Sequence, residues 1–368
     1  MREPGLVSGL GELRDALEQG ATLPADWYAD AAVARLERDA IFSRAWQYAG
    51  RAAQVAEAGS YFTCRAGQVP VVVARDREGT LRAFVNVCRH RGHLVVQGEG
   101  RRETLQCPYH AWTYGLDGCL RAAPRSDREP SFDPEDYPLL PVAVDSWGPC
   151  VFVNPDPEAR PVHEILAPLT EAVASSGLDL EGLRFHHRGE YEIAANWKIA
   201  VENYLECYHC PVAHPGFSSV VDVDPDAYVL TTFDWVSTQR GPARTDGRRR
   251  PYDPSGEIDA NTSVFFWPNF TLDVIPGAPN LLVGVFLPTG PEHTLGVADY
   301  YFGADVDERT AQEMIAFSEQ VGWEDNALVE GVQAGLASGA VPHGRLLPNS
   351  EKLIQHFQRL VYTALVES

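Results

Sequence analysis

Residues 88–92 read CRHRG and residues 107–118 read CPYHAWTYGLDG, so each segment carries one cysteine followed closely by one histidine. The candidate metal ligands in these segments are Cys88, His90, Cys107 and His110. Two thiolates and two imidazoles suit either a zinc ion or a [2Fe–2S] cluster in which the thiolates hold one iron and the imidazoles hold the other. Zinc fingers usually pair cysteine with cysteine. The mixed pairing therefore favours the cluster over zinc.

Short β-prone runs surround these segments between residues 61 and 152, for example VPVVVARD, LRAFVNVC and GPCVFVN, and turn residues separate them. This pattern predicts a small all-β domain, which we place at residues 46–155. A helical extension is expected before it, at residues 1–45. The segment PDPEARP (155–161) is the best candidate for a linker, and a second domain is expected over residues 160–368.

A second group of candidate ligands lies in NWKIAVENYLECYHCPVAHP, residues 196–215. It contains His209 and His214, with the carboxylate of Glu206 upstream. Two histidines and one carboxylate form the facial triad that binds iron(II) and leaves coordination positions open for dioxygen. This segment therefore predicts a mononuclear iron site.

Two cysteines in the same segment, Cys207 and Cys210, offer an alternative, because together with His209 and His214 they could form a zinc site. Residues two apart on a helix point in different directions, so Cys207 and His209 do not easily converge on one ion. Glu206 and His209 are three apart and share a helix face. The iron site is the favoured interpretation, and zinc stays the alternative.

Both groups of ligands resemble one known family. The spacing Cys88-x-His90 and Cys107-x2-His110 resembles the Rieske motif of ring-hydroxylating and related oxygenases. The resemblance extends from about residue 23 to residue 366. It implies an α+β protein with an N-terminal all-β Rieske [2Fe–2S] domain. The implied C-terminal catalytic domain is α+β, with an antiparallel sheet wrapped around a helix in the helix-grip, START-like arrangement.

The family pattern also implies roles for single residues. Glu206 occupies the position of the electron bridge to a Rieske histidine of a neighbouring subunit, where aspartate is the more common family choice. The third iron ligand is expected on a late amphipathic helix over residues 307–335, with Asp325 as the candidate and Glu324 or Glu330 as alternatives. Glutamate at the bridge position is more similar to the quaternary-ammonium branch, which includes the carnitine, glycine-betaine and stachydrine oxygenases.

The substrate pocket is expected near FFWPNFTLDVIPG (265–277), which resembles the pocket strand of that branch. The candidate pocket residues are Phe217, Trp235, Phe266 and Phe270, and Asn203 is expected in the outer shell of the iron site. An aromatic cage would attract a quaternary ammonium group through cation–π contacts. A flat aromatic acid would also fit an apolar pocket, and each aromatic residue alone could be an ordinary β-sheet core residue.

The resemblance implies an oxidoreductase with a [2Fe–2S] cluster, an Fe(II) ion and dioxygen as co-substrate. It implies hydroxylation of a C–H bond, and the expected reaction is oxidative N-demethylation or hydroxylation of a small quaternary ammonium substrate. Aromatic ring dihydroxylation is the alternative, and the second group of ligands argues against a mere electron carrier. Neither a Gly-x-Gly-x-x-Gly fingerprint nor a plant-type ferredoxin cysteine run is present, so NAD(P)H is expected to act through a separate reductase or ferredoxin. Electron transfer between subunits implies a homotrimer.

The amino-acid composition bears on the binding partners of the protein and on its location in the cell. The formal net charge of −21 argues against nucleic acid as a partner, because phosphate binding needs a basic surface. No apolar run approaches the length of a membrane helix, and the N-terminus shows no apolar signal region. With cysteines spaced as metal ligands, we expect a cytoplasmic protein.

Overall fold

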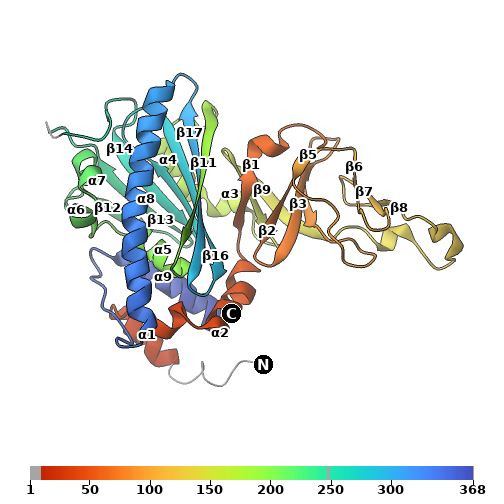
Figure 1. The fold of residues 1–368 in the computed structure, drawn as a ribbon, viewed down its shortest axis with the longest axis horizontal. Helices are drawn as coiled ribbons and strands as arrows, with labels where there is room; N and C mark the ends of the chain where they lie inside the picture. The colour runs from red at the N-terminus through yellow and green to blue at the C-terminus, as the bar shows by residue number, and fades with distance from the viewer. Residues whose placement is uncertain (1–9, 247–248, 368) are drawn as a thin grey trace. The chain divides into compact units, whose positions relative to one another are not determined.

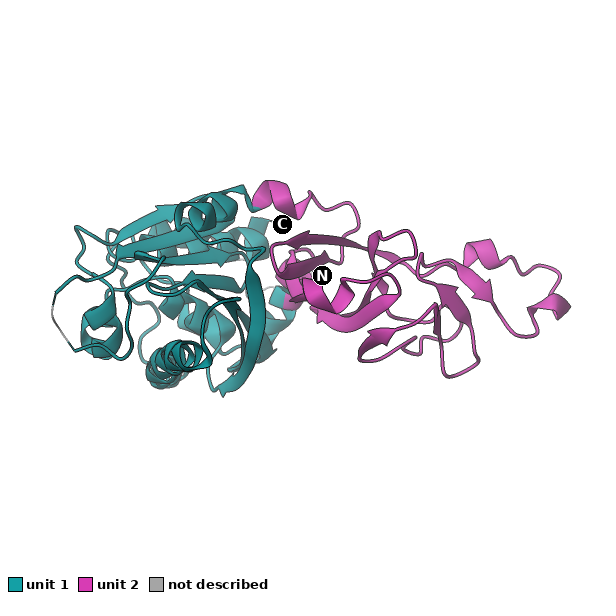
Figure 2. Cartoon of the chain, turned by 90° about the horizontal axis from the view of Figure 1, so that it is seen from above, with its two compact units in different colours: residues 1–37, 166–368 teal, residues 38–165 magenta. Residues whose placement is uncertain are grey.

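The computed structural model describes residues 10–246 and 249–367, which form two compact units (Figure 1, Figure 2). One unit comprises residues 38–165, and we call it the Rieske unit. The other combines the N-terminal segment that ends at Glu37 with the chain from Leu166 onward, and we call it the catalytic unit. Within the described residues, no helix is long and apolar enough to cross a membrane.

The Rieske unit is built from a seven-stranded and a three-stranded antiparallel sheet. The larger sheet has the order β1-β10-β9-β4-β3-β2-β5. Its strands are β1 (Gln47–Arg51), β2 (Ser60–Ala66), β3 (Val69–Arg75), β4 (Leu81–Val85), β5 (Glu99–Arg101), β9 (Pro141–Trp147) and β10 (Cys150–Asn154). The smaller sheet contains β6 (Thr104–Gln106), β7 (Thr113–Gly115) and β8 (Leu120–Ala122), and the short helix α3 (Val162–Ile165) ends the unit. The expected all-β domain is confirmed.

The boundaries of this unit differ from those expected. Residues 38–45 belong to the Rieske unit because side chains of its strands hold their backbone. Gln47 Nε2 donates to Phe42 O at 2.6 Å, and Asn154 Nδ2 donates to Arg44 O at 2.9 Å. At the other end, the Trp46 indole donates to Arg160 O at 2.9 Å, so the expected linker is attached to the Rieske unit as well.

The catalytic unit contains a seven-stranded antiparallel sheet in the order β11-β17-β16-β15-β14-β13-β12. Its strands are β11 (Leu183–Ile193), β12 (Val229–Thr232), β13 (Val236–Pro242), β14 (Ala260–Phe266), β15 (Phe270–Val274), β16 (Asn280–Gly290) and β17 (His293–Gly303). Its helices are α1 (Leu10–Glu18), α2 (Ala31–Glu37), α4 (Ala167–Ser175), α5 (Trp197–Tyr204), α6 (Cys210–Ala213), α7 (Pro215–Val220), α8 (Glu308–Ala337) and α9 (Lys352–Tyr362).

The long helix α8 packs along one face of this sheet (Figure 1). It begins after Asp307, whose carboxylate accepts a hydrogen bond from Thr310 N at 3.1 Å and satisfies a free amide of the first turn. Met314 and Phe317 on the helix share one buried cluster with Tyr300 and Phe302 of β17. The α+β architecture, with an antiparallel sheet packed against a long helix, is therefore confirmed.

The N-terminal segment is part of the catalytic unit because it carries the counter-ion of a buried lysine. Glu37 forms an ion pair with Lys198, and both side chains are almost inaccessible to solvent. Glu37 also accepts a hydrogen bond from the Trp197 indole at 2.9 Å. An unpaired lysine at this depth would be very costly. Glu37 therefore holds the first turn of α5, the helix that ends just before the candidate ligand His209.

Candidate metal centres and the adjoining cavity

Two loops of the Rieske unit carry the candidate cluster ligands, and the two loops have the same turn. Gly92 N donates to Cys88 O, and Ala111 N donates to Cys107 O, each at 3.0 Å. Both residues, four positions after their cysteine, have a positive φ, 74° for Gly92 and 58° for Ala111. A positive φ is easy for glycine and unusual for alanine, so the alanine is held by its surroundings. The two turns place the histidine of one loop beside the histidine of the other loop.

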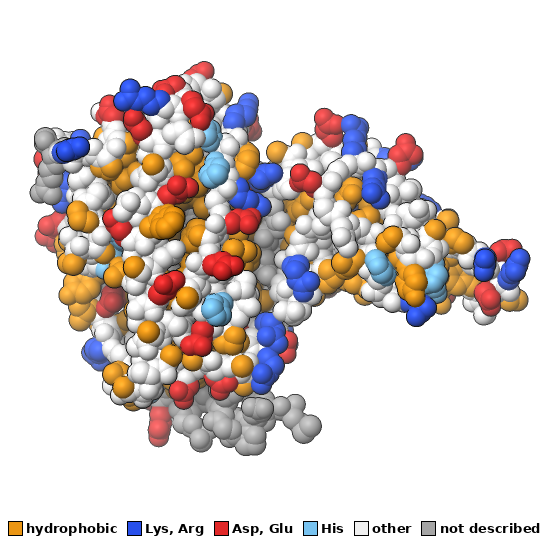
Figure 3. Space-filling view, viewed as in Figure 1, with side chains coloured by type: hydrophobic (Ala, Val, Ile, Leu, Met, Phe, Trp, Pro, Cys, Tyr) orange, Lys and Arg blue, Asp and Glu red, His pale blue; other side chains and the backbone are white. Residues whose placement is uncertain are grey.

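The four ligands divide into a buried pair and an exposed pair. Cys88 and Cys107 are 3% and 2% exposed, and their thiols are hydrogen-bonding neighbours. The rings of His90 and His110 lie at the surface with centroids 4.5 Å apart, and Figure 3 shows histidine side chains on the surface of this unit. Two thiols on the inside and two imidazoles on the outside fit a cluster with a different ligand pair on each iron.

The candidate iron ligands converge from separate parts of the catalytic unit. His209 precedes α6, His214 lies between α6 and α7, and Asp325 lies on α8. Their ligand atoms all lie within 4.8 Å of one another. His214 Nε2 lies 3.0 Å from His209 Nε2 and 2.9 Å from Asp325 Oδ1. Two imidazole nitrogens and one carboxylate oxygen aimed at one point fit the facial triad of a mononuclear Fe(II) site.

Each of these three side chains is held by a neighbour. Asn203 Nδ2 donates to Asp325 Oδ1 at 2.6 Å, and Glu324 Oε2 lies 2.7 Å from His214 Nδ1. Glu206 contacts His209 Nδ1. Outer contacts of this kind fix the tautomer and the orientation of a metal-binding imidazole. Glu324, expected as an alternative ligand, orients a histidine here.

The other alternative for the third ligand, Glu330, lies elsewhere. Its carboxylate accepts a hydrogen bond from Ala194 N at 3.1 Å, at the end of β11. Among the described acidic residues, Asp325 is the one that groups with the two histidines.

Negative charge surrounds the histidines. Burial alone would lower the pKa of His209, but the carboxylates of Asp325 and Glu206 outweigh it and raise the pKa to about 9. Burial likewise lowers the pKa of His214, and Asp325 together with Glu324 raises it. An environment that favours positive charge on the imidazoles also favours a divalent cation between them.

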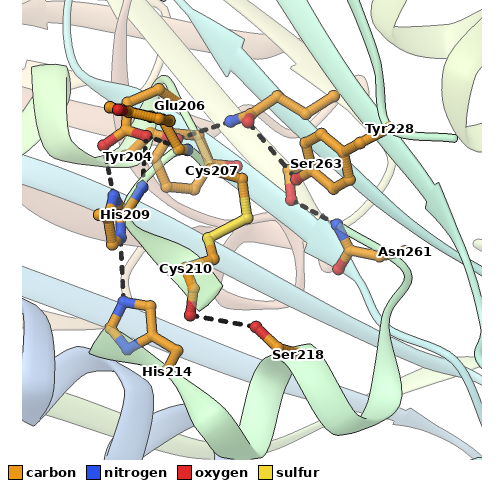
Figure 4. Close-up of a disulfide and its surroundings, with 12 residues drawn as sticks. Tyr204, Glu206, Cys207, His209, Cys210, His214, Ser218, Tyr228, Asn261 and Ser263 are labelled. Atoms are coloured by element: carbon orange, nitrogen blue, oxygen red, sulfur yellow. Dashed lines mark hydrogen bonds and ion pairs between the residues drawn. A yellow bond between two sulfur atoms is a disulfide. The ribbon is translucent and has the colours of Figure 1, made fainter. Parts of the chain in front are cut away.

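Cys207 and Cys210 form a disulfide, with His209 between them in the sequence. Figure 4 shows Glu206, His209 and His214 in one row beside it. The alternative of a zinc site with these cysteines is therefore wrong for this structure, because each sulfur is bonded to the other. The spacing Cys-x-x-Cys is compatible with a disulfide, and the sequence interpretation considered it only for metal binding.

A cavity of about 560 Å³ adjoins the triad, and His209, His214 and Asp325 form part of its wall. α5, α8 and the inner face of the sheet enclose it. Its aromatic lining consists of Tyr191, Tyr204, Phe217, Tyr228, Phe286, Tyr300, Phe317 and Trp323. Of the four aromatic residues expected in the pocket, Phe217 lines it.

The other three expected pocket residues lie outside the cavity lining. Side chains alternate between the two faces of a strand. Thr271 and Asp273 of β15 face the cavity, so Phe270 on the same strand faces the other side, where it is 1% exposed. Phe266 of β14 is buried in the same way, and Trp235 is 41% exposed between β12 and β13. Tyr191 of β11 and Tyr300 of β17 line the cavity instead. Their position follows from the pairing of the strands, which the sequence does not show.

Comparison with known proteins identifies the class. Residues 45–138 match the Rieske [2Fe-2S] domain, and residues 180–367 match the ring hydroxylating alpha subunit (catalytic domain). The chain belongs to the Rieske oxygenases with this alpha-subunit catalytic domain. The predicted class, the [2Fe–2S] cluster and the non-haem iron are confirmed, and zinc at residues 88–110 is set aside.

Individual relatives place the chain within that class. It is 35% identical to the carnitine monooxygenase oxygenase subunit of Acinetobacter pittii (strain PHEA-2), over 92% of this chain and 94% of the relative. It is 34% identical to the chloroplastic choline monooxygenase of Atriplex hortensis, over 95% and 79%. The solved structure of a quaternary ammonium Rieske monooxygenase, described with carnitine oxidation and inter-subunit electron transfer, matches with a TM-score of 0.83 and 33% identity, over 94% and 95%.

Proposed function

We propose that this oxygenase hydroxylates a C–H bond next to the nitrogen of a quaternary ammonium compound. The observation that carries the proposal is the cavity beside the facial triad, which combines eight aromatic side chains with carboxylates. Aromatic faces and carboxylates both attract an alkylammonium cation. Relatives that act on carnitine and choline support the same class of substrate.

The balanced reaction consumes one dioxygen, two electrons and two protons, and it yields the hydroxylated substrate and one water. If the hydroxyl group enters an N-methyl group, the product loses formaldehyde and becomes a demethylated amine. When bound, the cluster supplies single electrons and the iron supplies a site for dioxygen. Cys88, Cys107, His90 and His110 would hold the cluster. His209, His214 and Asp325 would hold the iron.

The residues around the triad have positioning tasks. Asn203, Glu206 and Glu324 orient the three candidate ligands through the contacts described above. We propose that Glu206 also bridges to a Rieske histidine of a neighbouring subunit in a homotrimer. The exposed position of His90 and His110 supports a contact of this kind. A relative linked to inter-subunit electron transfer supports it as well.

Electrons are proposed to come from NAD(P)H through a separate flavin- or ferredoxin-type reductase, in the cytoplasm. The test combines the purified, iron-loaded chain with such a reductase, NADH and quaternary ammonium compounds. We expect oxygen uptake that depends on both the reductase and the substrate, with hydroxylated or demethylated product identified by mass spectrometry. Steady turnover by the chain with NADH and substrate alone would contradict the need for a reductase. Absence of turnover with every quaternary ammonium compound would contradict the substrate class.

A further inference from the structure

Asp273 is a largely buried carboxylate in the cavity that neither metal site uses. It lies on β15, and its Oδ1 accepts a hydrogen bond from the Tyr204 hydroxyl at 3.0 Å. The Ser263 hydroxyl is its second partner, on the neighbouring strand and directly opposite in the register. Burial raises the pKa of Asp273 to about 6, although both hydroxyls lower it. Among the described residues, its hydrogen-bonding partners are hydroxyl groups and not a cation. A cation in the cavity could therefore pair with it.

The position of Asp273 relative to the triad is set by two adjacent residues at the end of α5. Asn203 donates to Asp325 at 2.6 Å, and the next residue, Tyr204, donates to Asp273. Tyr204 is fixed in turn by Gln239, whose Nε2 donates to the Tyr204 carbonyl at 2.6 Å. The iron-binding carboxylate and the cavity carboxylate are thus attached to the same helix end, so a ligand held by Asp273 has a defined position relative to the iron.

Several tyrosines of the cavity lie within electrostatic range of Asp273, and Tyr191 is also within range of Asp325. Burial, together with the negative charges of Asp325 and Asp273, raises the pKa of Tyr191 to about 12. Burial and Asp273 are also the largest causes that raise the pKa of Tyr228. Burial raises the pKa of Tyr300, with Glu319, Tyr191 and Asp273 contributing. A carboxylate and tyrosine rings that line one cavity offer both interactions that bind a quaternary ammonium group.

The rest of the cavity is unfavourable for a second, negatively charged group on the substrate. Beside Asp273, the carboxylates of Glu206, Glu319 and Asp325 line it, and the described lining residues include no lysine or arginine. A substrate carboxylate would therefore lie among like charges. One relative is named for carnitine, which carries a carboxylate, and another is named for choline, which does not. The sequence identities to these two relatives, 35% and 34%, are too similar to favour one substrate over the other.

We propose that Asp273 is the counter-ion that selects and positions the substrate, and that the substrate is a choline-like monocation and not a zwitterion. This inference rests on the proposed function and names its substrate class. Asp273 acts as a specificity-determining residue, because it contacts the charged group of the substrate and leaves the reacting C–H bond to the iron side of the cavity.

The experiment measures binding to the iron-loaded full chain by calorimetry. The ligands are choline, carnitine and 3,3-dimethyl-1-butanol, the neutral isostere of choline. We expect the wild type to bind choline at least about tenfold more tightly than either other ligand. Asp273→Asn should weaken choline binding by about tenfold to a hundredfold and leave the neutral alcohol almost unchanged. Glu257→Gln removes an exposed carboxylate outside the cavity lining and should change choline binding by less than about threefold.

Asp273→Glu keeps the charge and serves as the second variant, and it should retain the preference for choline over the neutral alcohol. The absorbance of the cluster and the iron content show that each variant is folded. Carnitine binding as tight as choline binding in the wild type, or unchanged choline binding in Asp273→Asn, would overturn the assignment. Tight choline binding without any oxygenation in the presence of the reductase would support the assignment of Asp273 and refute the proposed function.

A pH profile gives a readout that a purely structural role would not produce. Because the pKa of Asp273 is about 6, its charge appears as the pH rises from 5 to 7. The affinity of the wild type for choline should rise over this interval and then level off. Asp273 is hydrogen-bonded to Ser263 and Tyr204 and interacts electrostatically with Tyr191, Tyr228 and Tyr300, and none of these groups titrates below pH 7. In Asp273→Asn, the rise should disappear; its persistence would overturn the proposal.

Discussion

The four candidate cluster ligands lie between residues 88 and 110, in two loops of one unit, whereas the candidate iron ligands extend from residue 209 to residue 325. His214 and Asp325 are 111 positions apart in the sequence, yet their ligand atoms lie 2.9 Å apart. Each Rieske loop is closed by two backbone hydrogen bonds of its own, which the carbonyl and the amide of its cysteine form with residues four and five positions later, respectively. The iron site exists only when α5, α8 and the segment around α6 are in place. The cluster site therefore depends on the spacing of ligands within two short loops. The iron site depends on the folding of the whole catalytic unit, and we call it the assembled site.

The two sites also differ in exposure. The candidate imidazole ligands of the cluster lie at the surface, where an electron donor or acceptor can approach them. His214 is 1% exposed and lines an interior cavity. The difference matches their tasks, since electrons can cross a short gap between molecules, whereas a substrate must be enclosed with dioxygen.

Removing one ligand of the assembled site tests this comparison most severely. In Asp325→Ala, iron should fall from about three to about two atoms per chain and turnover should fall to background, because two histidines alone hold Fe(II) poorly. The visible absorbance of the cluster should remain. Glu330→Gln on the same helix is the matched control, because glutamine still offers an oxygen to Ala194 N. Loss of the cluster together with the iron would show that the two sites are not independent.

A change far from the iron in sequence tests whether the catalytic unit depends on the N-terminal segment. Glu37→Ala leaves buried Lys198 without its partner, so the free energy of unfolding of the catalytic unit should fall by about 3–5 kcal/mol. Calorimetry measures this transition, and cluster absorbance follows the Rieske unit separately. The double variant Glu37→Leu/Lys198→Met removes both charges and should be much less destabilised. Equal destabilisation of the double variant would show that the ion pair is not the cause.

An outer contact of the iron site should have the smallest effect. Glu324→Gln weakens the hydrogen bond that orients His214, so iron affinity should fall by about 10–100-fold while the cluster is unaffected. Competition with an iron chelator measures the affinity. Gln320→Ala is the control, because Gln320 donates to the other oxygen of Glu324, and its effect should stay below about threefold. Similar losses in both variants would indicate a general disturbance of α8.

Much of the fold was predictable because its signals are periodic or local. The late helix was expected over residues 307–335 and extends over Glu308–Ala337. The strands of the Rieske unit follow their short β-prone runs. The domain boundaries were displaced, because Asn154 of β10 holds the backbone of Arg44, and Trp46, just before β1, holds the backbone of the expected linker at Arg160.

Three of the four aromatic residues expected in the pocket lie outside the cavity lining. Phe266 and Phe270 are aromatic and lie near the expected strand, yet they face away from the cavity. Their strands present Ser263, Thr271 and Asp273 to the cavity instead. A shift of one residue along a strand exchanges the two faces, and sequence composition does not reveal which face is the inner one. The disulfide was missed for a related reason, because Cys-x-x-Cys spacing suits both metal binding and a disulfide.

The sequence by itself determined the class of the protein, and it predicted the cluster ligands and the two iron-binding histidines, because these residues lie within short motifs with a fixed spacing. Only the tertiary structure groups Asp325, and neither Glu324 nor Glu330, with the two histidines, because the three carboxylates on one helix point in different directions. It also placed Asp273 and its tyrosines around one cavity. Their proximity arises from strand pairing over long stretches of chain, which no local pattern encodes.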